Sequence, residues 1–131
     1  MKVLFDYRGS SCSDLFSVKN FIEKTLKKLN TYIDDKDLLF DIKLILSELV
    51  VNGALHGNCS DSHKKVYLKV MIDSQSIIII VRDEGEGIEI EEIKCDSLSC
   101  SGRGLMIVEA LTDKLILNNN EVIAIKSLIS G

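Results

Sequence analysis

Three polar side chains stand at four-residue intervals near the middle of the chain. Glu48, Asn52 and His56 occur in the run ELVVNGALHG. On an α-helix this interval places them on one stripe of the surface, with about 40° of drift per step. A carboxylate can orient a hydroxyl or accept its proton, and an amide carbonyl is an oxygen ligand that suits magnesium. Taken alone, the stripe is more typical of an ordinary solvent-exposed helix face than of a metal and base site, which is the alternative interpretation.

An aspartate followed by glycines comes directly after a strongly apolar run. In VRDEGEGI the run delivers Asp83 into a turn that holds Gly85, Gly87 and Ile88. An ionised aspartate only accepts hydrogen bonds, which suits the exocyclic amine of an adenine, and glycines let the backbone approach a flat ring. Aspartate and glycine are also favoured in ordinary turns, so the motif alone is equally compatible with a structural turn.

A second pair of glycines opens a short predicted helix. In SGRGLMIVEAL, Gly102 and Gly104 flank Arg103 and are followed by Leu105. The first N–H groups of a helix have no partner within it and lie at the positive end of its dipole, so they stabilise a phosphate. Arg103 adds a cation. The alternative interpretation is a flexible glycine hinge before the helix.

Two amphipathic helices are expected to precede the apolar strands and to carry the first motif. Apolar residues at three- and four-residue spacing predict a helix from Asp14, which with Ser13 is a candidate N-cap, to near Asn30. A second helix is expected to begin within residues 34–37, where acidic side chains suit the positive end of the dipole. His56 and the glycine after it are expected to close this helix, because both residue types are favoured at a helix C-terminus.

Strand-like runs fill most of the remaining chain. The opening KVLFDY is expected to form a first or edge strand that the cluster from Gly9 to Ser13 breaks. KVYLKVMI and SIIIIVRD, joined by residues 73–75, predict one hairpin, and KLILN and EVIAIKSLI, joined by residues 118–120, predict another. Because SIIIIVRD is apolar on both faces, it is expected in the middle of the sheet. The order predicts an α+β class, a single domain over residues 1–131 with helices on one face of a mixed, mostly antiparallel sheet.

The composition argues against several classes of function. A chain of 131 residues with 46% hydrophobic residues suffices for one domain with its own core. The net charge of -4 and the pI near 5.2 give no electrostatic reason to bind nucleic acid or an anionic membrane. No long apolar run follows the N-terminus, so we expect a cytoplasmic protein without a signal peptide or a spanning helix. Cys12, Cys59, Cys95 and Cys100 form no CxxC pair and are expected to be free thiols.

The three motifs follow one another in an order that gives them joint weight. A helix with base and ligand oxygens, a strand with a glycine turn, and a glycine-containing helix start together resemble the GHKL ATPase superfamily. Within it, the chain resembles the small bacterial anti-sigma-factor serine/threonine kinases. ELVVNGALHG is similar to the N box of that family, DEGEGI to its first glycine box and SGRGL to its second. The resemblance covers nearly the whole chain and implies the histidine-kinase-like (Bergerat-type) ATP-binding fold, with ATP and Mg²⁺ as cofactors.

The resemblance also implies a role for each matched residue. Glu48 corresponds to the general base, and Asn52 corresponds to the magnesium ligand. Asp83 corresponds to the carboxylate that reads adenine, whereas the part of the N-box histidine is more structural. The residues expected to bind the nucleotide are Asn52, His56, Asp83, Gly85, Gly87, Ile88, Gly102, Arg103, Gly104 and Leu105.

Three features depart from the family pattern. The segment 89–101, which corresponds to the ATP lid, is short and acidic at its start. Gly53 stands where the family has alanine, which costs the helix about 1 kcal/mol of stability. Asn119 and Asn120 replace a Gly-Thr pair, so an amide is expected to take the place of the threonine hydroxyl that helps hold adenine through water.

The resemblance implies a protein serine/threonine kinase that transfers the γ-phosphoryl group of ATP to a serine of an antagonist protein and sequesters a sigma factor, as a homodimer. Phosphoryl transfer needs chiefly positioning and charge neutralisation, which a magnesium ion, a helix N-terminus and Glu48 would supply. A histidine kinase is disfavoured because the chain has no room for a helical hairpin with a phospho-accepting histidine. The main alternative is a regulatory module that binds nucleotide without kinase activity, and a third is an α+β domain without a ligand.

Overall fold

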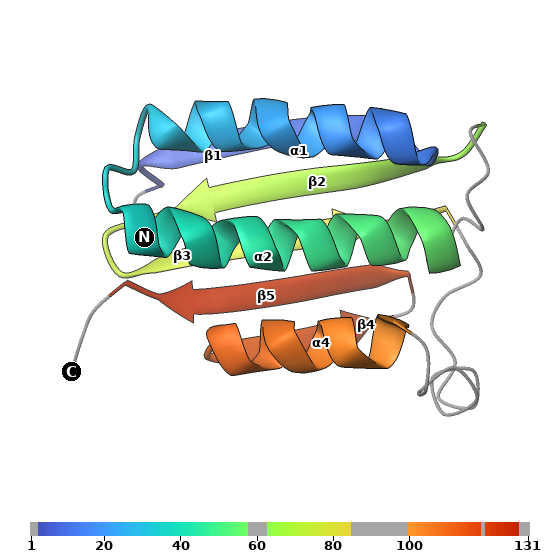
Figure 1. The fold of residues 1–131 in the computed structure, drawn as a ribbon. Helices are drawn as coiled ribbons and strands as arrows, with labels where there is room; N and C mark the ends of the chain where they lie inside the picture. Colours follow the sequence, from blue (N-terminus) through green and yellow to red (C-terminus); the bar gives the residue numbers. More distant parts are fainter. Residues whose placement is uncertain (1–2, 58–62, 85–99, 119, 129–131) are drawn as a thin grey trace.

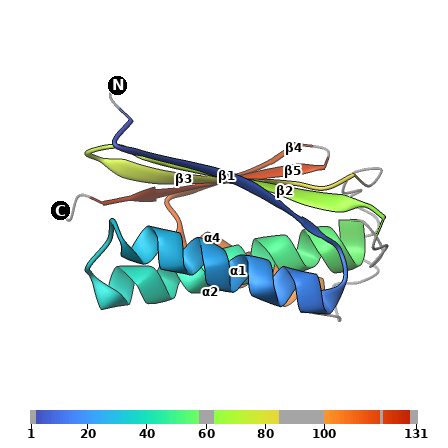
Figure 2. The same cartoon turned by 90° about the horizontal axis from the view of Figure 1, so that it is seen from above.

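The computed structural model describes residues 3–57, 63–84, 100–118 and 120–128, of which 56, 57 and 100–105 are described by their backbone alone. Within these ranges five strands and three α-helices form two layers, with the helices on one face of the sheet (Figure 1, Figure 2). In chain order the elements are β1 (Phe5–Cys12), α1 (Leu15–Asn30), α2 (Lys36–Asn52) with the π-helical turn η1 (Gly53–Gly57), β2 (Lys65–Ile72), β3 (Ser76–Arg82), α4 (Cys100–Leu111), β4 (Lys114–Asn118) and β5 (Glu121–Ser127).

The strands form one sheet in the order β1-β2-β3-β5-β4. All four described pairs are antiparallel. β3 lies in the centre, where Ile79 pairs with Val70 on one side and with Ala124 on the other. The predicted α+β class is therefore confirmed, and so is the central position of the SIIIIVRD run.

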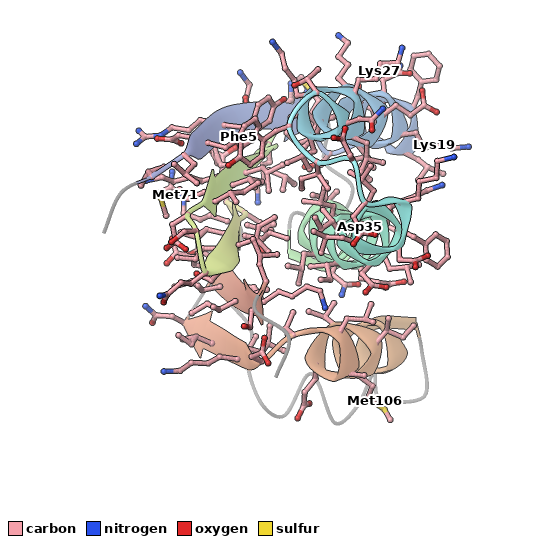
Figure 3. All side chains as sticks on the ribbon, turned by 90° about the vertical axis from the view of Figure 1, so that its left-hand side faces the viewer. Phe5, Lys19, Lys27, Asp35, Met71 and Met106 are labelled. Atoms are coloured by element: carbon pink, nitrogen blue, oxygen red, sulfur yellow. The ribbon has the colours of Figure 1, made fainter. Side chains whose placement is uncertain are left out.

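Burial follows the periods of strand and helix. Alternate residues of β2 and β3 are buried on the face that the helices cover, and α2 packs a buried stripe against them. Each such side chain contributes about 1.5–3 kcal/mol when it leaves water, so this layer fixes α2 on the sheet. In Figure 3, Met71 lies on the open face of the sheet, whereas Lys19 and Met106 point away from the sheet on the helix side. The buried residues of these three elements are Ile42, Ile45, Leu46, Leu49, Val50, Val66, Leu68, Val70, Ile72, Ile77, Ile79 and Val81.

Both long helices begin where the sequence predicts. The Asp14 carboxylate caps α1 by accepting hydrogen bonds from the backbone N–H of Ser17 at 2.9 Å and from its hydroxyl at 2.8 Å. These bonds lower the pKa of Asp14. Asp35 caps α2 by accepting from the N–H groups of Asp37 and Leu38. Aspartate is a preferred N-cap residue, so local sequence sets both helix starts.

The first strand differs from its prediction. β1 continues through most of the cluster from Gly9 to Ser13 and pairs with β2 along its whole length, so the predicted break is wrong. Gly9 has a packing role instead, because a Cβ on this residue would lie 2.8 Å from Cε1 of Phe21 in α1. A glycine inside a strand often marks such a close approach. Here it lets the helix lie against the edge strand.

The two hairpins form as predicted. At the end of β2 the Asp73 carboxylate accepts hydrogen bonds from the N–H groups of Gln75 at 2.7 Å and Ser76 at 2.8 Å, and these bonds lower the pKa of Asp73. β4 pairs with β5 up to Asn118 opposite Glu121. Side-chain hydrogen bonds to the backbone of this kind are why aspartate is common in turns.

The structure bears on the expectations for the cysteines and for a membrane-spanning helix. Cys12 is a half-buried free thiol, as predicted, whereas the side chains of the other three cysteines lie outside what the structure describes. No helix within the described ranges is long and apolar enough to cross a membrane.

Candidate functional site

α2 brings Glu48 and Asn52 onto one stripe, as their spacing predicts. Both residues are half-buried and lie next to the buried Leu49 and Val50. The Nδ2 atom of Asn52 is shielded from solvent and has no hydrogen-bond partner among the described residues. Buried polar groups are nearly always hydrogen-bonded, so this amide is a candidate for contact with a ligand or an ordered water.

The end of α2 lies directly against the end of β3. A Cβ on Gly53 would lie 3.7 Å from the Cβ of Asp83 and 3.4 Å from Cγ1 of Val66 in β2. Because Gly53 follows Asn52 in the chain, this contact brings the last residues of α2 close to Asp83. The helix continues here as the π-helical turn η1, a feature found frequently at functional sites.

Hydrogen bonds fix the main chain where β3 ends. Asp83 is buried, and its N–H donates to the carbonyl oxygen of Asn120 at 3.0 Å. In the opposite direction, Nδ2 of Asn120 donates to the carbonyl oxygen of Asp83 at 2.5 Å. On the other side, the Glu84 carboxylate accepts a hydrogen bond from the N–H of Lys65 in β2. The strand end is thus held from both sides, and a connected polar network of this kind makes it rigid.

The side chain of Asn120 has a contact that the sequence analysis missed. An amide at this position is expected to replace a hydroxyl that contacts adenine through water, whereas the described contact is with the main chain of Asp83. The strand register explains it, because Arg82 pairs with Glu121 and the next residue pair outward is Asp83 and Asn120. The contact between Glu84 and β2 was missed for the same reason, since no local pattern reveals a register.

α4 runs antiparallel to α2 and directs its first turn toward the same end of the molecule. The Lys126 ammonium donates to the Leu111 carbonyl oxygen at 2.9 Å and lies 3.7 Å from the Asp41 carboxylate, so the last residue of α4 lies near Asp41. From there, eleven residues lead along α2 to Asn52 and eleven lead back along α4 to Cys100, a distance of about 16 Å in each helix. Since the two helices pack together, the first turn of α4 lies beside the end of α2 (Figure 1).

The structure therefore brings Glu48, Asn52 and Asp83 to one end of the fold, together with the backbone of the first turn of α4. The predicted lid lies outside the described residues as far as residue 99. Some of the other predicted site residues are described by their backbone alone: His56 in η1, and Gly102, Arg103, Gly104 and Leu105 in α4. The remaining ones, Gly85, Gly87 and Ile88, lie outside the described ranges.

The position of these residues at one end of the fold and a comparison with protein families together identify the class of protein. The chain belongs to the histidine kinase-like ATPase domain family, whose model matches residues 17–126. This membership confirms the resemblance drawn from the three motifs, and it implies ATP as the bound nucleotide.

Within this family the chain is similar to proteins named anti-sigma F factor. It is 36% identical over 86 residues to the one from Oceanobacillus iheyensis, an alignment that covers 60% of this chain and 59% of the relative. It is 32% identical over 112 residues to the one from Priestia megaterium, covering 79% of this chain and 76% of the relative. It is 29% identical over 116 residues to the one from Bacillus subtilis, covering 82% and 80%. The chain spans about three-fifths of the length of the first of these relatives.

The residues at this end suit a magnesium ion that is held together with a nucleotide. Among the residues that the structure describes, no three His, Cys, Asp or Glu side chains are grouped so that they could hold a metal by themselves. Magnesium needs fewer protein ligands, because it keeps several waters and takes phosphate oxygens from its substrate. The Glu48 carboxylate and the carbonyl oxygen of the Asn52 amide, both on half-buried side chains, are oxygen groups of the kind that magnesium binds.

Proposed function

We propose that the chain is an Mg²⁺-dependent and ATP-dependent protein serine/threonine kinase that phosphorylates an antagonist protein and sequesters a sigma factor. The observation that supports it most is the close approach at Gly53, which sets the Asn52 end of α2 against Asp83. A kinase of this type needs its base, its metal ligand and its adenine contact around one nucleotide. Family membership and the similarity to anti-sigma F factors support the same assignment.

Three elements bind the nucleotide in this proposal. Asp83 accepts a hydrogen bond from the exocyclic amine of adenine, and we assign Gly85, Gly87 and Ile88 to the contacts with the ring because glycines allow close approach. The free N–H groups at the start of α4 bind the phosphates, and Arg103 adds positive charge. The hydrogen bonds that fix the Asp83 main chain support this role, because a carboxylate that reads a base must be held in place before the base arrives.

Phosphoryl transfer depends on two side chains of α2 in this proposal. Asn52 is the protein ligand of Mg²⁺, which when bound neutralises charge on the phosphate oxygens. Glu48, one helical turn earlier, orients the serine hydroxyl of the antagonist. It accepts the hydroxyl proton as the bond from the serine oxygen to phosphorus forms and the bond from phosphorus to ADP breaks.

The proposed partners follow from the relatives. Their name, anti-sigma F factor, states an opposition to a sigma factor, and we extend this role to the present chain as a proposal. The net charge of -4 favours partner surfaces that are basic. A homodimer is part of the same proposal.

A phosphoryl-transfer assay tests the proposal. The purified protein is incubated with Mg²⁺, γ-labelled ATP and its cognate antagonist, and label is expected on the antagonist. Glu48→Gln is expected to slow transfer by roughly a hundredfold or more and to leave MgATP affinity nearly unchanged, because it removes the base and keeps the shape. Glu23→Gln, on the exposed side of α1, is the matched control and is expected to transfer label normally.

Two outcomes contradict the proposal at different levels. Wild-type protein that binds MgATP but labels no antagonist would overturn the kinase and leave a regulatory module that binds nucleotide. Wild-type protein whose melting temperature does not rise with MgATP would refute the nucleotide site itself, since a ligand that binds only the folded state must stabilise it.

A further inference from the structure

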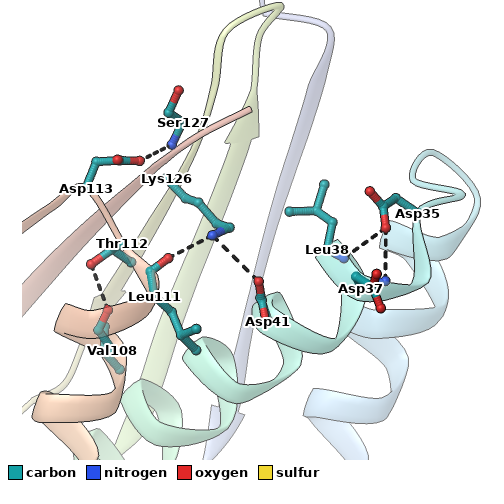
Figure 4. A network of polar contacts seen from close by, with 10 residues as sticks. All are labelled: Asp35, Asp37, Leu38, Asp41, Val108, Leu111, Thr112, Asp113, Lys126 and Ser127. Carbon is teal, nitrogen blue, oxygen red and sulfur yellow. Dashed lines mark hydrogen bonds and ion pairs between the residues drawn. The ribbon is translucent and has the colours of Figure 1, made fainter. Parts of the chain in front are cut away.

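One side chain joins the last turn of α4 to two other elements, at the end of the fold away from the candidate site. Lys126 in β5 donates from Nζ to the carbonyl oxygen of Leu111 at 2.9 Å and lies 3.7 Å from Oδ2 of Asp41 in α2 (Figure 4). The Lys126 and Asp41 side chains are only 20% and 34% exposed, so water screens their charges in part. A single ammonium group on β5 therefore connects α2 with α4.

The C-terminal end of α4 needs this cation because the helix does not supply its own. The last carbonyl groups of a helix lack partners within it and form the negative end of its dipole. No side chain in the last turn of α4 is basic, and Glu109 there is acidic. The Thr112 hydroxyl donates to the Val108 carbonyl oxygen at 2.7 Å, and Lys126 satisfies that of Leu111. Lys126 is thus the positive charge at this helix end.

Apolar packing holds the described part of α4 along a narrow stripe. Val108 is buried and Leu111 is partly buried, whereas Met106 is 70% and Ile107 is 41% exposed. Ridges and grooves on helix surfaces repeat along the axis, and packed helices can shift past one another by small distances. The hydrogen bond from Lys126 is a directional contact at one end of α4, so it helps to fix the axial position of α4 on α2.

The stripe of α2 that reaches Lys126 also carries the candidate site. Asp41, Glu48 and Asn52 are separated by seven and four residues, so they lie within about 40° of one another around the helix axis. Asp41 lies near Lys126 at one end of this stripe, and Asn52 lies at the other end, next to Gly53, which packs against Asp83. A shift of α4 along this stripe changes the distance between its first turn and Asn52.

We propose that Lys126 is a positioning residue for nucleotide binding. By joining the end of α4 to Asp41, it sets the axial position of α4 on α2 and so places the phosphate-binding turn of α4 relative to Asn52. The inference rests on the proposed function, in which these two points bind the phosphates and Mg²⁺. Loss of the contact weakens binding of the phosphates and leaves the adenine contact at Asp83 unchanged. The reason is that hydrogen bonds to Asn120 hold the Asp83 main chain, and Glu84 is held by β2, independently of α4.

Affinities for two ligands test this inference. MgATP is titrated by calorimetry, and adenosine, which lacks phosphates, is titrated by NMR. Lys126→Met keeps the length of the side chain without its charge, Lys126→Arg keeps a cation that can donate, and Lys114→Met, on an exposed residue of β4, is the matched control. We expect Lys126→Met to bind MgATP about three- to tenfold more weakly than wild type with unchanged adenosine affinity. We expect the other two variants to bind both ligands as wild type does.

The outcomes separate this inference from the proposed function. The inference is overturned if Lys126→Met binds MgATP as tightly as wild type does. It is also overturned if this variant loses affinity equally for MgATP and adenosine, or if Lys126→Arg binds MgATP as weakly as Lys126→Met. If Lys126→Met does not fold, Asp41→Asn is tested in its place, since that change removes only the charge pair with α2. A loss of affinity for MgATP alone supports the inference, whereas wild-type affinities for both ligands overturn it. Wild-type protein that fails to bind MgATP refutes the proposed function and the inference with it.

Discussion

The two ends of the helix layer differ in how their polar groups are satisfied. At one end, Lys126 contacts two other elements, and the Asp113 carboxylate accepts a hydrogen bond from the Ser127 N–H (Figure 4). At the other end, the Asn52 amide nitrogen is buried with no partner among the described residues, beside a π-helical turn. A satisfied network makes its surroundings rigid, whereas a buried group without a partner lowers stability. In the proposed function, the Asn52 end contacts the ligand, whereas the Lys126 end supports the helices.

The largest expected effect on nucleotide binding separates two buried aspartates, each of which directly follows a strand. Asp83→Asn is expected to weaken MgATP binding by about ten- to hundredfold, because it removes a charged acceptor for the adenine amine. Asp73→Asn is the matched control, since Asp73 is equally buried but lies in the β2–β3 hairpin at the other end. It is expected to bind MgATP normally. Calorimetry on both proteins checks this, and equal affinities for the two variants would contradict the comparison.

Replacing the unpartnered amide is expected to affect binding and stability in opposite directions. Asn52→Leu is expected to weaken MgATP binding by about tenfold, since it removes the proposed metal ligand. It is also expected to raise the unfolding free energy of the ligand-free protein by about 1 kcal/mol, because a buried polar group without a partner is lost. Calorimetry and urea unfolding measure the two effects, with Asn20→Leu on the exposed face of α1 as control. A variant less stable than wild type would show that the amide has a structural role.

At the Lys126 end, by contrast, replacing the polar side chain is expected to lower the stability of the protein. Lys126→Met is expected to lower the unfolding free energy by about 1–2 kcal/mol, because the Leu111 carbonyl and the α4 dipole lose their cation. Urea unfolding of this variant beside Lys114→Met measures the loss. If Lys126→Met and Lys114→Met are equally stable, the contacts of Lys126 do not stabilise this end of the fold, and the contrast with the Asn52 end fails.

A smaller effect is expected at the junction of α2 and η1. Gly53→Ala is expected to raise the unfolding free energy by about 0.5–1 kcal/mol, because alanine favours the helix and limits the unfolded chain. The backbone there is helical, with φ of -61° and ψ of -43°, and a new Cβ would lie no closer than 3.4 Å to its neighbours. Thermal unfolding tests this, and a lower melting temperature would mean that the approach to Asp83 tolerates no methyl group.

The smallest expected effect is sensitivity to acid. Backbone N–H groups lower the pKa values of Asp14 and Asp73 in the folded protein. The folded protein then binds fewer protons than the unfolded chain near and below about pH 4, so this contribution to stability is complete above that range and is lost as the pH falls through it. Urea unfolding from neutral pH downward is expected to show the decline, and Asp73→Asn is expected to show a shallower one. An equally steep decline in that variant would assign the sensitivity to other groups.

The parts of the fold that depend on local chemistry could be predicted from the sequence. Asp14 caps α1 because a capping carboxylate needs only the N–H groups of the next turn, and Asp73 forms its turn in the same way. The stripe with Glu48 and Asn52 follows from helical spacing alone. Motif order then predicted the family.

The parts that depend on distant contacts could not be predicted. Gly9 has the sequence pattern of a strand breaker, and only the approach of Phe21 from α1 shows its packing role. Asn120 reaches Asp83 through the register of β3 and β5. Lys126 meets Asp41 only because α2 lies over the sheet near the end of β5. Each of these pairs joins residues in or next to two different elements, so its contact depends on how the elements pack and not on any local pattern of sequence.

The central claim is that the ends of α2 and β3 and the start of α4 surround one nucleotide. Backbone amide shifts on adding MgATP to the labelled protein test it most directly. The account predicts that amides from Asn52 to Ala54, those of Asp83 and Glu84, and those of the first turn of α4 shift together with one affinity, while the hairpin at Asp73 stays unchanged. Shifts at the end of α2 without shifts at Asp83, or with a different affinity there, would contradict a shared site.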